Sequence, residues 1–163
     1  MIETAIASLS YKLGINPSWL RDLIRFESRW NPLAKNKISG AMGLIQFTNS
    51  TAKNLGFQSA QDLVTRYPTA EGQLLGPVKQ YFELPGNQGP YPNKQSFYMT
   101  VFYPAARKWP EDKFFPDNVR KANPGINTVK DYINKVDGII LKNASPIVIL
   151  IIGMVLYIIS KKG

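Results

Sequence analysis

Hydrophobic residues in the first part of the chain recur every three or four positions, which is the spacing of one face of a helix. The pattern predicts a helix over residues 2–12, closed by a glycine, and a second helix that starts at residue 17. Asn16 is a typical cap for the second helix, and an Asn-Pro pair at positions 31–32 stops it. Glu27 is therefore expected near the C-terminal end of a helix whose other face is apolar.

Clusters of glycine, proline and small polar residues divide the rest of the chain into short helices. Loops are predicted at residues 33–43 and 84–92, and residues 110–126 have the composition of irregular structure. Further helices are predicted to begin at Thr48 or Asn49, at Ser59, at Thr69, at Gln95 (with a bend at Pro104) and at Asn127. No alternating strand pattern precedes the C-terminal tail, so the predicted fold class is mainly α.

The C-terminal segment, residues 144–160, is apolar throughout and carries no charge, and lysines flank it on both sides. As a helix it would be on the order of 25 Å long, slightly shorter than a hydrocarbon core. The segment predicts a single C-terminal transmembrane helix that anchors the protein, with the membrane as a partner. The alternative is a terminal helix or strand buried in the core.

Charge and the missing residue types narrow the chemistry. The net charge of +9 favours an anionic partner, such as nucleic acid, anionic lipid or bacterial cell-wall polymer. The lysines and arginines are scattered and no nucleic-acid motif is present, which argues against nucleic acid. The chain has no cysteine and no histidine, so disulfides, Ser-His-Asp triads and His- or Cys-ligated zinc are excluded. No metal or cofactor is implied, and acid–base chemistry must rest on Asp, Glu, Lys or Tyr.

The segment from Glu27 to Gln46 is the best candidate for that chemistry. It sets one carboxyl group at a helix end near Phe26 and Trp30, where desolvation raises a carboxyl pKa toward the range of a general acid. A glycine-containing loop follows, which lets the backbone approach a ligand closely. Gln46 at its end can both donate and accept hydrogen bonds. Alone, this pattern is also compatible with a solvated glutamate on a helix surface.

The order and spacing of these residues resemble the catalytic motif of the soluble lytic transglycosylase family, whose relatives include goose-type lysozymes. That motif reads E-S-x-aromatic-N-P-x-A, then G-A-x-G-L-M-Q, then T-A, and this chain supplies each piece with Ile45 in place of Met. A second, looser motif, A-Y-N-A-G, resembles residues 102–106. The resemblance implies a lysozyme-like catalytic domain over residues 1–126. An amphipathic connecting helix (127–143) and the transmembrane anchor (144–160) would follow it.

The resemblance also implies roles for individual residues. Glu27 matches the family's catalytic acid/base, Gln46 its sugar-contacting glutamine and Tyr103 its active-site tyrosine. Gly43 belongs to the tight loop at the floor of the cleft. The preceding loop is one residue longer than usual, so the family's cleft serine falls at Asn36 or is replaced by Ser39.

A departure concerns the second motif, where Pro104 stands in the position of the family's asparagine. The hydrogen bond of that asparagine is therefore lost or supplied elsewhere, which affects the second half of the cleft and not the acid.

The implied reaction is cleavage of the MurNAc–GlcNAc β-1,4 bond of peptidoglycan glycan strands by a single Glu, which gives 1,6-anhydro-muropeptides. A hydrolytic muramidase with Asp62 or Glu71 as its second carboxylate is one alternative. A non-catalytic peptidoglycan-binding membrane protein is another. A basic membrane-active or nucleic-acid-associated protein, whose tail is the functional part, is a third.

The cellular setting is expected to be a membrane. The N-terminus lacks the basic start and apolar run of a secretory signal, although peptidoglycan lies outside the cytoplasmic membrane. The form of the second motif resembles phage members of the family. We expect a phage enzyme anchored in a virion membrane, for penetration or lysis of the host, and otherwise an enzyme of the bacterial cytoplasmic membrane.

Overall fold

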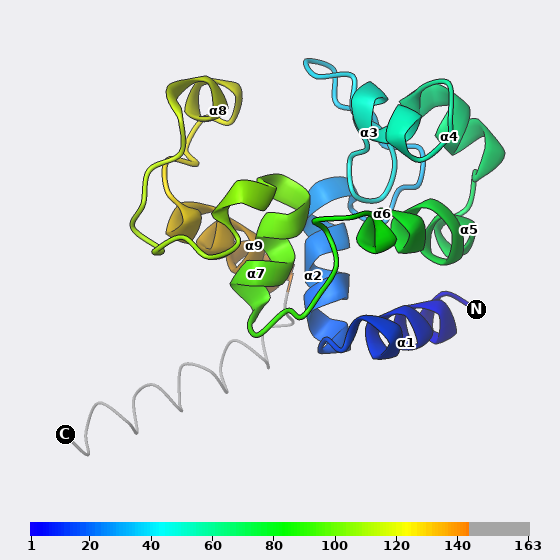
Figure 1. The fold of residues 1–163 in the computed structure, drawn as a ribbon, viewed down its shortest axis with the longest axis horizontal. Coiled ribbons are helices and arrows are strands. Elements are labelled where there is room, and N and C mark those ends of the chain that lie inside the picture. The colour runs from blue at the N-terminus through cyan, green and yellow to red at the C-terminus, as the bar shows by residue number, and fades with distance from the viewer. Residues whose placement is uncertain (144–163) are drawn as a thin grey trace.

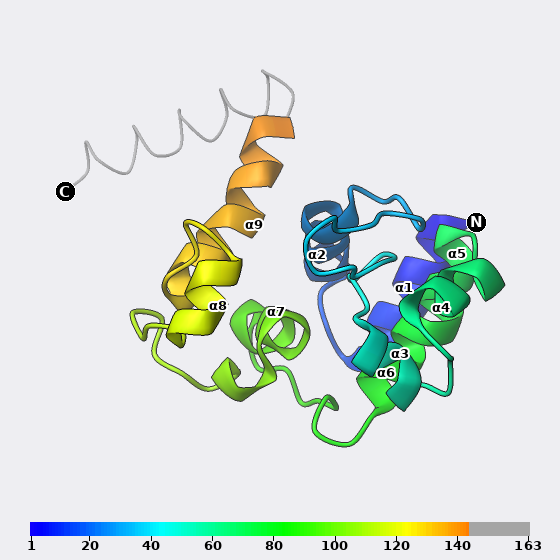
Figure 2. The same ribbon diagram turned by 90° about the horizontal axis from the view of Figure 1, so that it is seen from above.

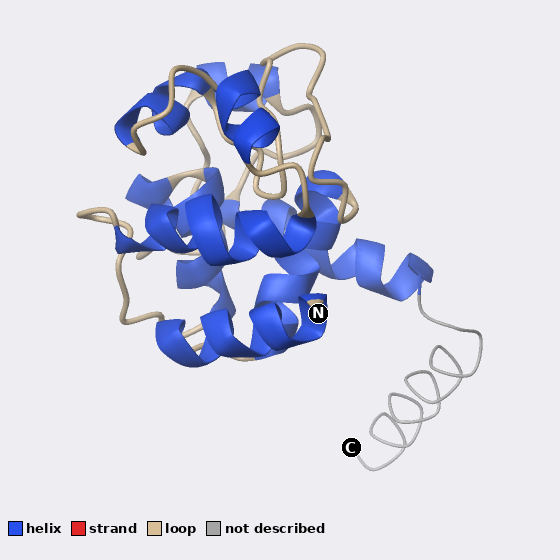
Figure 3. Ribbon diagram, turned by 90° about the vertical axis from the view of Figure 1, so that its right-hand side faces the viewer, coloured by secondary structure: helices blue, strands red, loops and turns tan. Residues whose placement is uncertain are grey.

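The computed structural model describes residues 1–143, and Figure 1 shows them as helices joined by loops. The helices are α1 (Ile2–Leu13), α2 (Pro17–Ser28), α3 (Asn49–Asn54), α4 (Ala60–Arg66), α5 (Ala70–Gln73), the π-helix η1 (Leu74–Val78), α6 (Lys79–Glu83), α7 (Lys94–Phe102), the 3-10 helix η2 (Pro104–Ala106), α8 (Asp117–Ala122) and α9 (Val129–Asn143). Within this range the only β pairing consists of isolated bridges, and Figure 3 shows no strand there.

The predicted fold class needs a correction at its C-terminal element. No helix within residues 1–143 is long and apolar enough to cross a membrane. The segment predicted to do so, residues 144–160, lies outside the described residues. The transmembrane helix is therefore removed from the fold class. The membrane partner and the membrane-anchored localisation, in a virion or in a bacterial cytoplasmic membrane, are removed with it. The prediction rested on hydropathy, which measures a preference for leaving water and not the place where the segment goes.

The helix α2 is the centre of the described fold. It packs against α1, α7 and α9, and Figure 2 shows it with α7 and α9 on one side and α1 and α3–α6 on the other. The side chain of Asn16 accepts a hydrogen bond from the backbone N–H of Ser18, so the predicted cap is formed. The buried face of the helix consists of Leu20, Leu23, Ile24 and Ser28. One helix therefore contributes to the packing on both sides.

The end of α2 comes before the Asn-Pro pair that was expected to stop it. Arg29 and Trp30 both adopt positive φ, at 53° and 65°, and the backbone N–H of Arg29 bonds to the carbonyl of Arg25. Left-handed conformations are uncommon for non-glycine residues and end a helix at once. The turn redirects the chain just after Glu27 and leaves that residue in the last turn of α2.

Two other predictions differ in detail from the structure. The helix expected over residues 95–107 ends at Phe102, because Tyr103 is extended and Pro104 opens the separate helix η2. The stretch expected to be irregular, residues 110–126, contains the short helix α8. None of the side chains of α8 is buried. The sequence therefore has no periodic hydrophobic pattern there from which a helix could be predicted.

Aromatic residues form much of the hydrophobic core. Phe82 stacks on Phe97 with their ring centroids 5.1 Å apart, and Tyr91 meets both rings edge-on. The largest fully buried aromatic side chains are Tyr98, Tyr132, Phe47, Phe82, Phe97 and Phe115. Tyr132 and Phe115 come from the C-terminal part of the described chain, so this part belongs to the same core as α1 and α2.

Candidate active site

Glu27 lies in the last turn of α2, where its carboxyl group meets α9. The hydroxyl of Tyr132 donates a hydrogen bond to Glu27 Oε1 over 2.5 Å. The glutamate side chain is only partly exposed. Desolvation by the surrounding protein raises the pKa of Glu27 to about 7, against the smaller lowering effect of the Tyr132 hydrogen bond. The carboxyl group can therefore hold a proton near neutral pH.

The position of Tyr132 is fixed by aromatic neighbours. Its ring stacks on Phe102 of α7 at a centroid distance of 4.2 Å, and Phe26 of α2 meets it edge-on at 5.2 Å. Burial and the nearby charge of Glu27 raise the pKa of Tyr132 well above 10, so its hydroxyl stays protonated and remains a donor. The sequence reasoning missed this residue. Its place on the apolar face of α9, beside Val129 and Val136, was the signal that could have found it.

The loop between α2 and α3 folds back on itself through short backbone contacts. Met42 bridges to Lys35 on one side and to Phe47 on the other. Gly43 has a φ of 85°, and a Cβ at this position would lie 2.8 Å from Gln73 Oε1 and 3.2 Å from the ring of Phe47. Both the backbone conformation and the lack of space require glycine at position 43.

Gln73 fastens this loop to the rest of the domain. The side chain is fully buried, and its Oε1 accepts a hydrogen bond from the backbone N–H of Leu44 at 2.9 Å. Its Nε2 donates to the carbonyls of Pro32, at 2.7 Å, and Tyr67, at 2.9 Å. The buried side-chain amide of Gln73 thus connects both ends of the loop between α2 and α3 to the segment before α5. The sequence reasoning did not single it out, because a glutamine in a polar stretch gives no sign of burial.

Gln46 lies in the same loop with its backbone in the left-handed region, at a φ of 55°. Its Nε2 donates to the carbonyl of Gly43 at 3.0 Å, and its neighbours Ile45 and Phe47 are buried. The side chain itself is partly exposed, and among the contacts of residues 1–143 its Oε1 has no hydrogen-bond donor. Gln46 therefore keeps a free acceptor in a fixed position. Strained backbone of this kind is common in binding sites.

Asn36 and Ser39 lie in the exposed part of the loop and bond to its own backbone. Asn36 Oδ1 accepts from the N–H groups of Ile38 and Ser39, at 2.9 and 3.0 Å. Ser39 Oγ accepts from the N–H of Ala41 at 3.3 Å. In the described part of the chain, neither side chain forms a hydrogen bond with Glu27 or Tyr132. These contacts give both residues a role in shaping the loop, and their role toward substrate stays a prediction.

Tyr103 follows α7 and is connected to the acid through aromatic rings. Its ring lies 5.6 Å from that of Trp109 and 5.7 Å from that of Phe115. Phe115 in turn lies 5.3 Å from Phe102, which stacks on Tyr132. The structure thus brings Tyr103 into one aromatic cluster with the residue that bonds to Glu27. Tyr103 remains partly exposed, so it can still contact a ligand.

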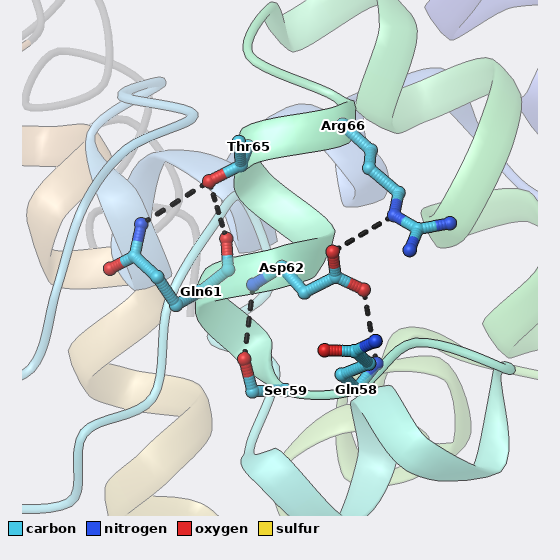
Figure 4. Close-up of polar contacts among 6 residues, drawn as sticks. All are labelled: Gln58, Ser59, Gln61, Asp62, Thr65 and Arg66. Atoms are coloured by element: carbon cyan, nitrogen blue, oxygen red, sulfur yellow. Dashed lines mark hydrogen bonds and ion pairs between the residues drawn. The ribbon is translucent and has the colours of Figure 1, made fainter.

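Asp62, a candidate second carboxylate, is engaged in local structure. Figure 4 shows its carboxylate between Gln58 and Arg66, accepting from the Gln58 backbone N–H at 3.0 Å and from Arg66 Nε at 2.9 Å. Ser59 Oγ accepts from the Asp62 N–H and so caps the start of α4. The hydrogen bond from Gln58, helped by Arg66, lowers the pKa of Asp62.

Glu71, the other candidate, pairs with the N-terminal amino group of Met1 at 2.8 Å. Both carboxylates thus have structural partners elsewhere. Among residues 1–143 there is also no group of three His, Cys, Asp or Glu side chains that could hold a metal ion.

Fold and site together define a class: a helical domain in which one partly buried carboxyl group, bonded to a tyrosine, can act as an acid near neutral pH. Residues 4–71 match the family model described as the transglycosylase SLT domain, which confirms the resemblance seen in the sequence. The match supports a lytic transglycosylase-type function with peptidoglycan as substrate. It includes Glu27 and Gln46 but ends before Tyr103 and Tyr132. No curated protein and no solved structure matches the chain.

Proposed function

We propose that this protein is a lytic transglycosylase that cleaves the MurNAc–GlcNAc β-1,4 bond of peptidoglycan with Glu27 as its acid and base. The observation that supports this most directly is the pKa of Glu27, raised to about 7 by burial at the end of α2. A general acid is most effective when its pKa lies near the working pH. The family match of the segment that contains Glu27 supports the same assignment.

In the first step, the protonated carboxyl group of Glu27 gives its proton to the glycosidic oxygen as the bond to the anomeric carbon breaks. The leaving GlcNAc hydroxyl keeps that proton. Positive charge then develops on the muramic acid ring, and Glu27 becomes a carboxylate. The hydroxyl of Tyr132 stabilises this carboxylate, because its hydrogen bond to Oε1 is stronger once the acceptor is charged.

In the second step, the 6-hydroxyl of the same muramic acid attacks its own anomeric carbon. Glu27 takes the proton of that hydroxyl as the new C1–O6 bond forms, so the carboxyl group returns to its starting state. The product is a 1,6-anhydro sugar and no water is consumed. Gln46, with a free acceptor, and Tyr103, partly exposed, are proposed to bind the sugars through hydrogen bonds around this charge. Gly43 is proposed to let the loop backbone approach them.

A hydrolase of the same fold would need a second carboxylate to activate water or to act as nucleophile. Both candidates in the sequence have structural partners, Asp62 in the cap of α4 and Glu71 at the N-terminus. This supports a mechanism with one carboxyl group. A phage origin stays a prediction from the form of residues 102–106.

The test is a digest of purified peptidoglycan with the wild-type protein and with Glu27→Gln, followed by mass spectrometry of the released muropeptides. We expect products one water lighter than those of a hydrolase, released by the wild type only. Products with normal reducing ends would make the protein a muramidase. A folded wild type that binds peptidoglycan without releasing any product would instead be a binding protein.

A further inference from the structure

The helices α2 and α9, which carry Glu27 and Tyr132, meet at a second level further along their lengths. Asp22 precedes Glu27 on α2 by five residues, and Asp137 follows Tyr132 on α9 by five residues. At about 1.5 Å per residue, both steps are about 7.5 Å along the helix. Burial raises the pKa of Asp22, and the charge of Asp137 adds to the rise, so the two carboxylates act on each other.

Lys94 of α7 connects the two carboxylates of this second level. Its Nζ donates a hydrogen bond to Asp137 Oδ2 over 2.5 Å. Its charge also opposes the rise that burial and Asp137 cause in the pKa of Asp22. Arg25, whose Nη1 lies 3.7 Å from Asp22 Oδ1, is a second cation of the group. Since α7 packs against both α2 and α9, one lysine faces an acid from each of these two helices (Figure 2).

The buried side chain of Tyr98 is a second indication that the two carboxylates lie close together. Tyr98 follows Lys94 by about one turn of α7 and is fully buried. Burial raises the pKa of Tyr98 well above 10, and the charges of Asp22 and Asp137 both add to the rise. Because two charges act on one buried hydroxyl, both carboxylates lie at the junction of α2, α7 and α9.

The position of Lys94 is unfavourable for its own helix. Lys94 is the first residue of α7 and directly follows the cap Asn93. The N-terminus of a helix favours negative charge and disfavours a cation. The local structure of α7 therefore does not account for a lysine at this position, whereas the carboxylates of Asp22 and Asp137 do.

We propose that Lys94 is a positioning residue for the acid Glu27. By holding Asp22 and Asp137 together, Lys94 sets how closely α9 approaches α2. That approach sets the hydrogen bond from Tyr132 to Glu27, and through it the acidity of the carboxyl group. The effect on catalysis rests on the proposed function, whereas the effect on the pKa of Glu27 does not.

Loss of Lys94 is expected to raise the pKa of Glu27. The two carboxylates then repel each other and move α9 away from α2. The ring of Tyr132 stays packed against Phe26 and Phe102, so Glu27 remains buried, but a hydrogen bond tolerates only a small change of distance and angle. Burial raises the pKa of Glu27 and this hydrogen bond lowers it, so a weaker hydrogen bond leaves the pKa higher.

Tyr81 of α6 also faces Glu27, whose charge contributes to the raised pKa of Tyr81 after the larger effects of burial and of Tyr91. The hydroxyl of Tyr81 donates to the carbonyl of Thr100 at 2.6 Å. Tyr81 therefore has its own partner on α7, and the change at Glu27 comes through Tyr132.

The experiment is a pH titration of the Glu27 carboxyl carbon by NMR in the full-length protein labelled with carbon-13 glutamate. The signal of Glu27 is the one that Glu27→Gln lacks. We expect Lys94→Met to raise the pKa of Glu27 from about 7 by about half a pH unit, a roughly threefold change in proton affinity. Lys94→Arg keeps the charge and should keep the wild-type pKa. The matched control is Lys12→Met, which breaks an ion pair of the same 2.5 Å length and similar exposure between α1 and α6 and should leave Glu27 unchanged.

Two double variants test the route of the effect. Lys94→Met/Asp137→Asn removes the repulsion together with the ion pair and should return the pKa of Glu27 toward the wild-type value. Lys94→Met in the Tyr132→Phe background should cause no further shift, because the hydrogen bond through which Lys94 acts is already gone. If Lys94→Met does not fold, Lys94→Gln takes its place in every comparison.

An unchanged or lowered pKa of Glu27 in Lys94→Met, or an equal rise in Lys12→Met, would overturn the proposal. A double variant Lys94→Met/Asp137→Asn that stays fully shifted, or a full further shift in the Tyr132→Phe background, would overturn it as well. In muropeptide release, the alkaline limb of kcat/KM should move upward with the pKa in Lys94→Met while KM stays unchanged. A wild type that releases no product would end the proposed function, and the titration would still decide the role of Lys94.

Discussion

The hydroxyl of Tyr132 lies 2.5 Å from Oε1 of Glu27 and joins two residues that are 105 positions apart. Burial and this hydrogen bond shift the pKa of Glu27 in opposite directions. Burial of the carboxyl group raises the pKa of Glu27, whereas the hydrogen bond favours the charged form and lowers it. The helix α9 thereby sets the acidity of a residue that α2 positions.

Replacing Tyr132 by Phe removes the hydrogen bond and keeps the ring. The pKa of Glu27 should then rise further, because only the lowering contribution is lost. The alkaline limb of kcat/KM, near pH 7 in the wild type, should move upward in the variant. The limb is measured as the pH dependence of muropeptide release. Tyr81→Phe is the control, since it removes another buried hydroxyl, bonded to the Thr100 carbonyl, and should leave the limb in place. An unshifted limb in Tyr132→Phe would show that the hydrogen bond does not control the acid.

Glu27→Gln should abolish activity and stabilise the fold at neutral and alkaline pH. The folded-state pKa of about 7 lies above the ordinary value of 4.5, so the wild type loses stability as pH rises from about 4.5 through 7. Glutamine does not titrate, so the variant avoids this loss. The difference in unfolding free energy should be near zero at pH 4 and reach up to about 3 kcal/mol at pH 8.

Denaturant unfolding at both pH values measures this difference. Glu83→Gln provides a control of opposite sign. The Lys12 hydrogen bond lowers the pKa of Glu83, so that replacement should destabilise the fold near neutral pH and have less effect in acid. A Glu27→Gln variant that gains nothing at pH 8 would mean that the carboxyl group is well solvated.

The sequence predicted local structure well where it depends on near neighbours. The Asn16 cap and the helix start at Ser59 are both present, since each depends on residues within a few positions. Contacts between distant segments were not predictable. Tyr132 looked like one more residue of an amphipathic helix, and Gln73 like a polar surface residue. Tyr132 acquires its role only through the packing of α9 on α2. Gln73 acquires its role only because α5 lies beside the loop between α2 and α3.

Gln73→Ala should destabilise the fold by roughly 2–4 kcal/mol. The replacement leaves the N–H of Leu44 and the carbonyls of Pro32 and Tyr67 without their partner, and buried polar groups without hydrogen bonds are costly. Denaturant unfolding measures the loss. Gln61→Ala on the exposed face of α4 is the matched control and should stay within about 0.5 kcal/mol of the wild type. Similar values for the two variants would argue against Gln73 as the residue that fastens the loop.

Gly43→Ala tests whether the loop needs space as well as a left-handed backbone. Gly56 has nearly the same φ, 87° against 85°, but an added Cβ there meets nothing within 4 Å. Gly56→Ala should therefore cost about 1 kcal/mol from backbone strain alone. Gly43→Ala should cost more, because its Cβ would lie 2.8 Å from Gln73 Oε1. Thermal or denaturant unfolding of both variants gives the difference. Equal losses would show that the contact with Gln73 relaxes without cost.

Asp62→Asn separates the mechanism with one carboxyl group from the one with two. The two carboxylate oxygens accept hydrogen bonds from Gln58 and Arg66 at the start of α4, and the single amide oxygen of asparagine can keep one of the two. We expect a small loss of stability, unchanged kcat/KM and the same 1,6-anhydro products. Muropeptide mass spectra and unfolding curves of the wild type, Asp62→Asn and Glu27→Gln check this together. If folded Asp62→Asn were as inactive as Glu27→Gln, then Asp62 would take part in the reaction, and hydrolysis by two carboxylates would replace transglycosylation as the mechanism.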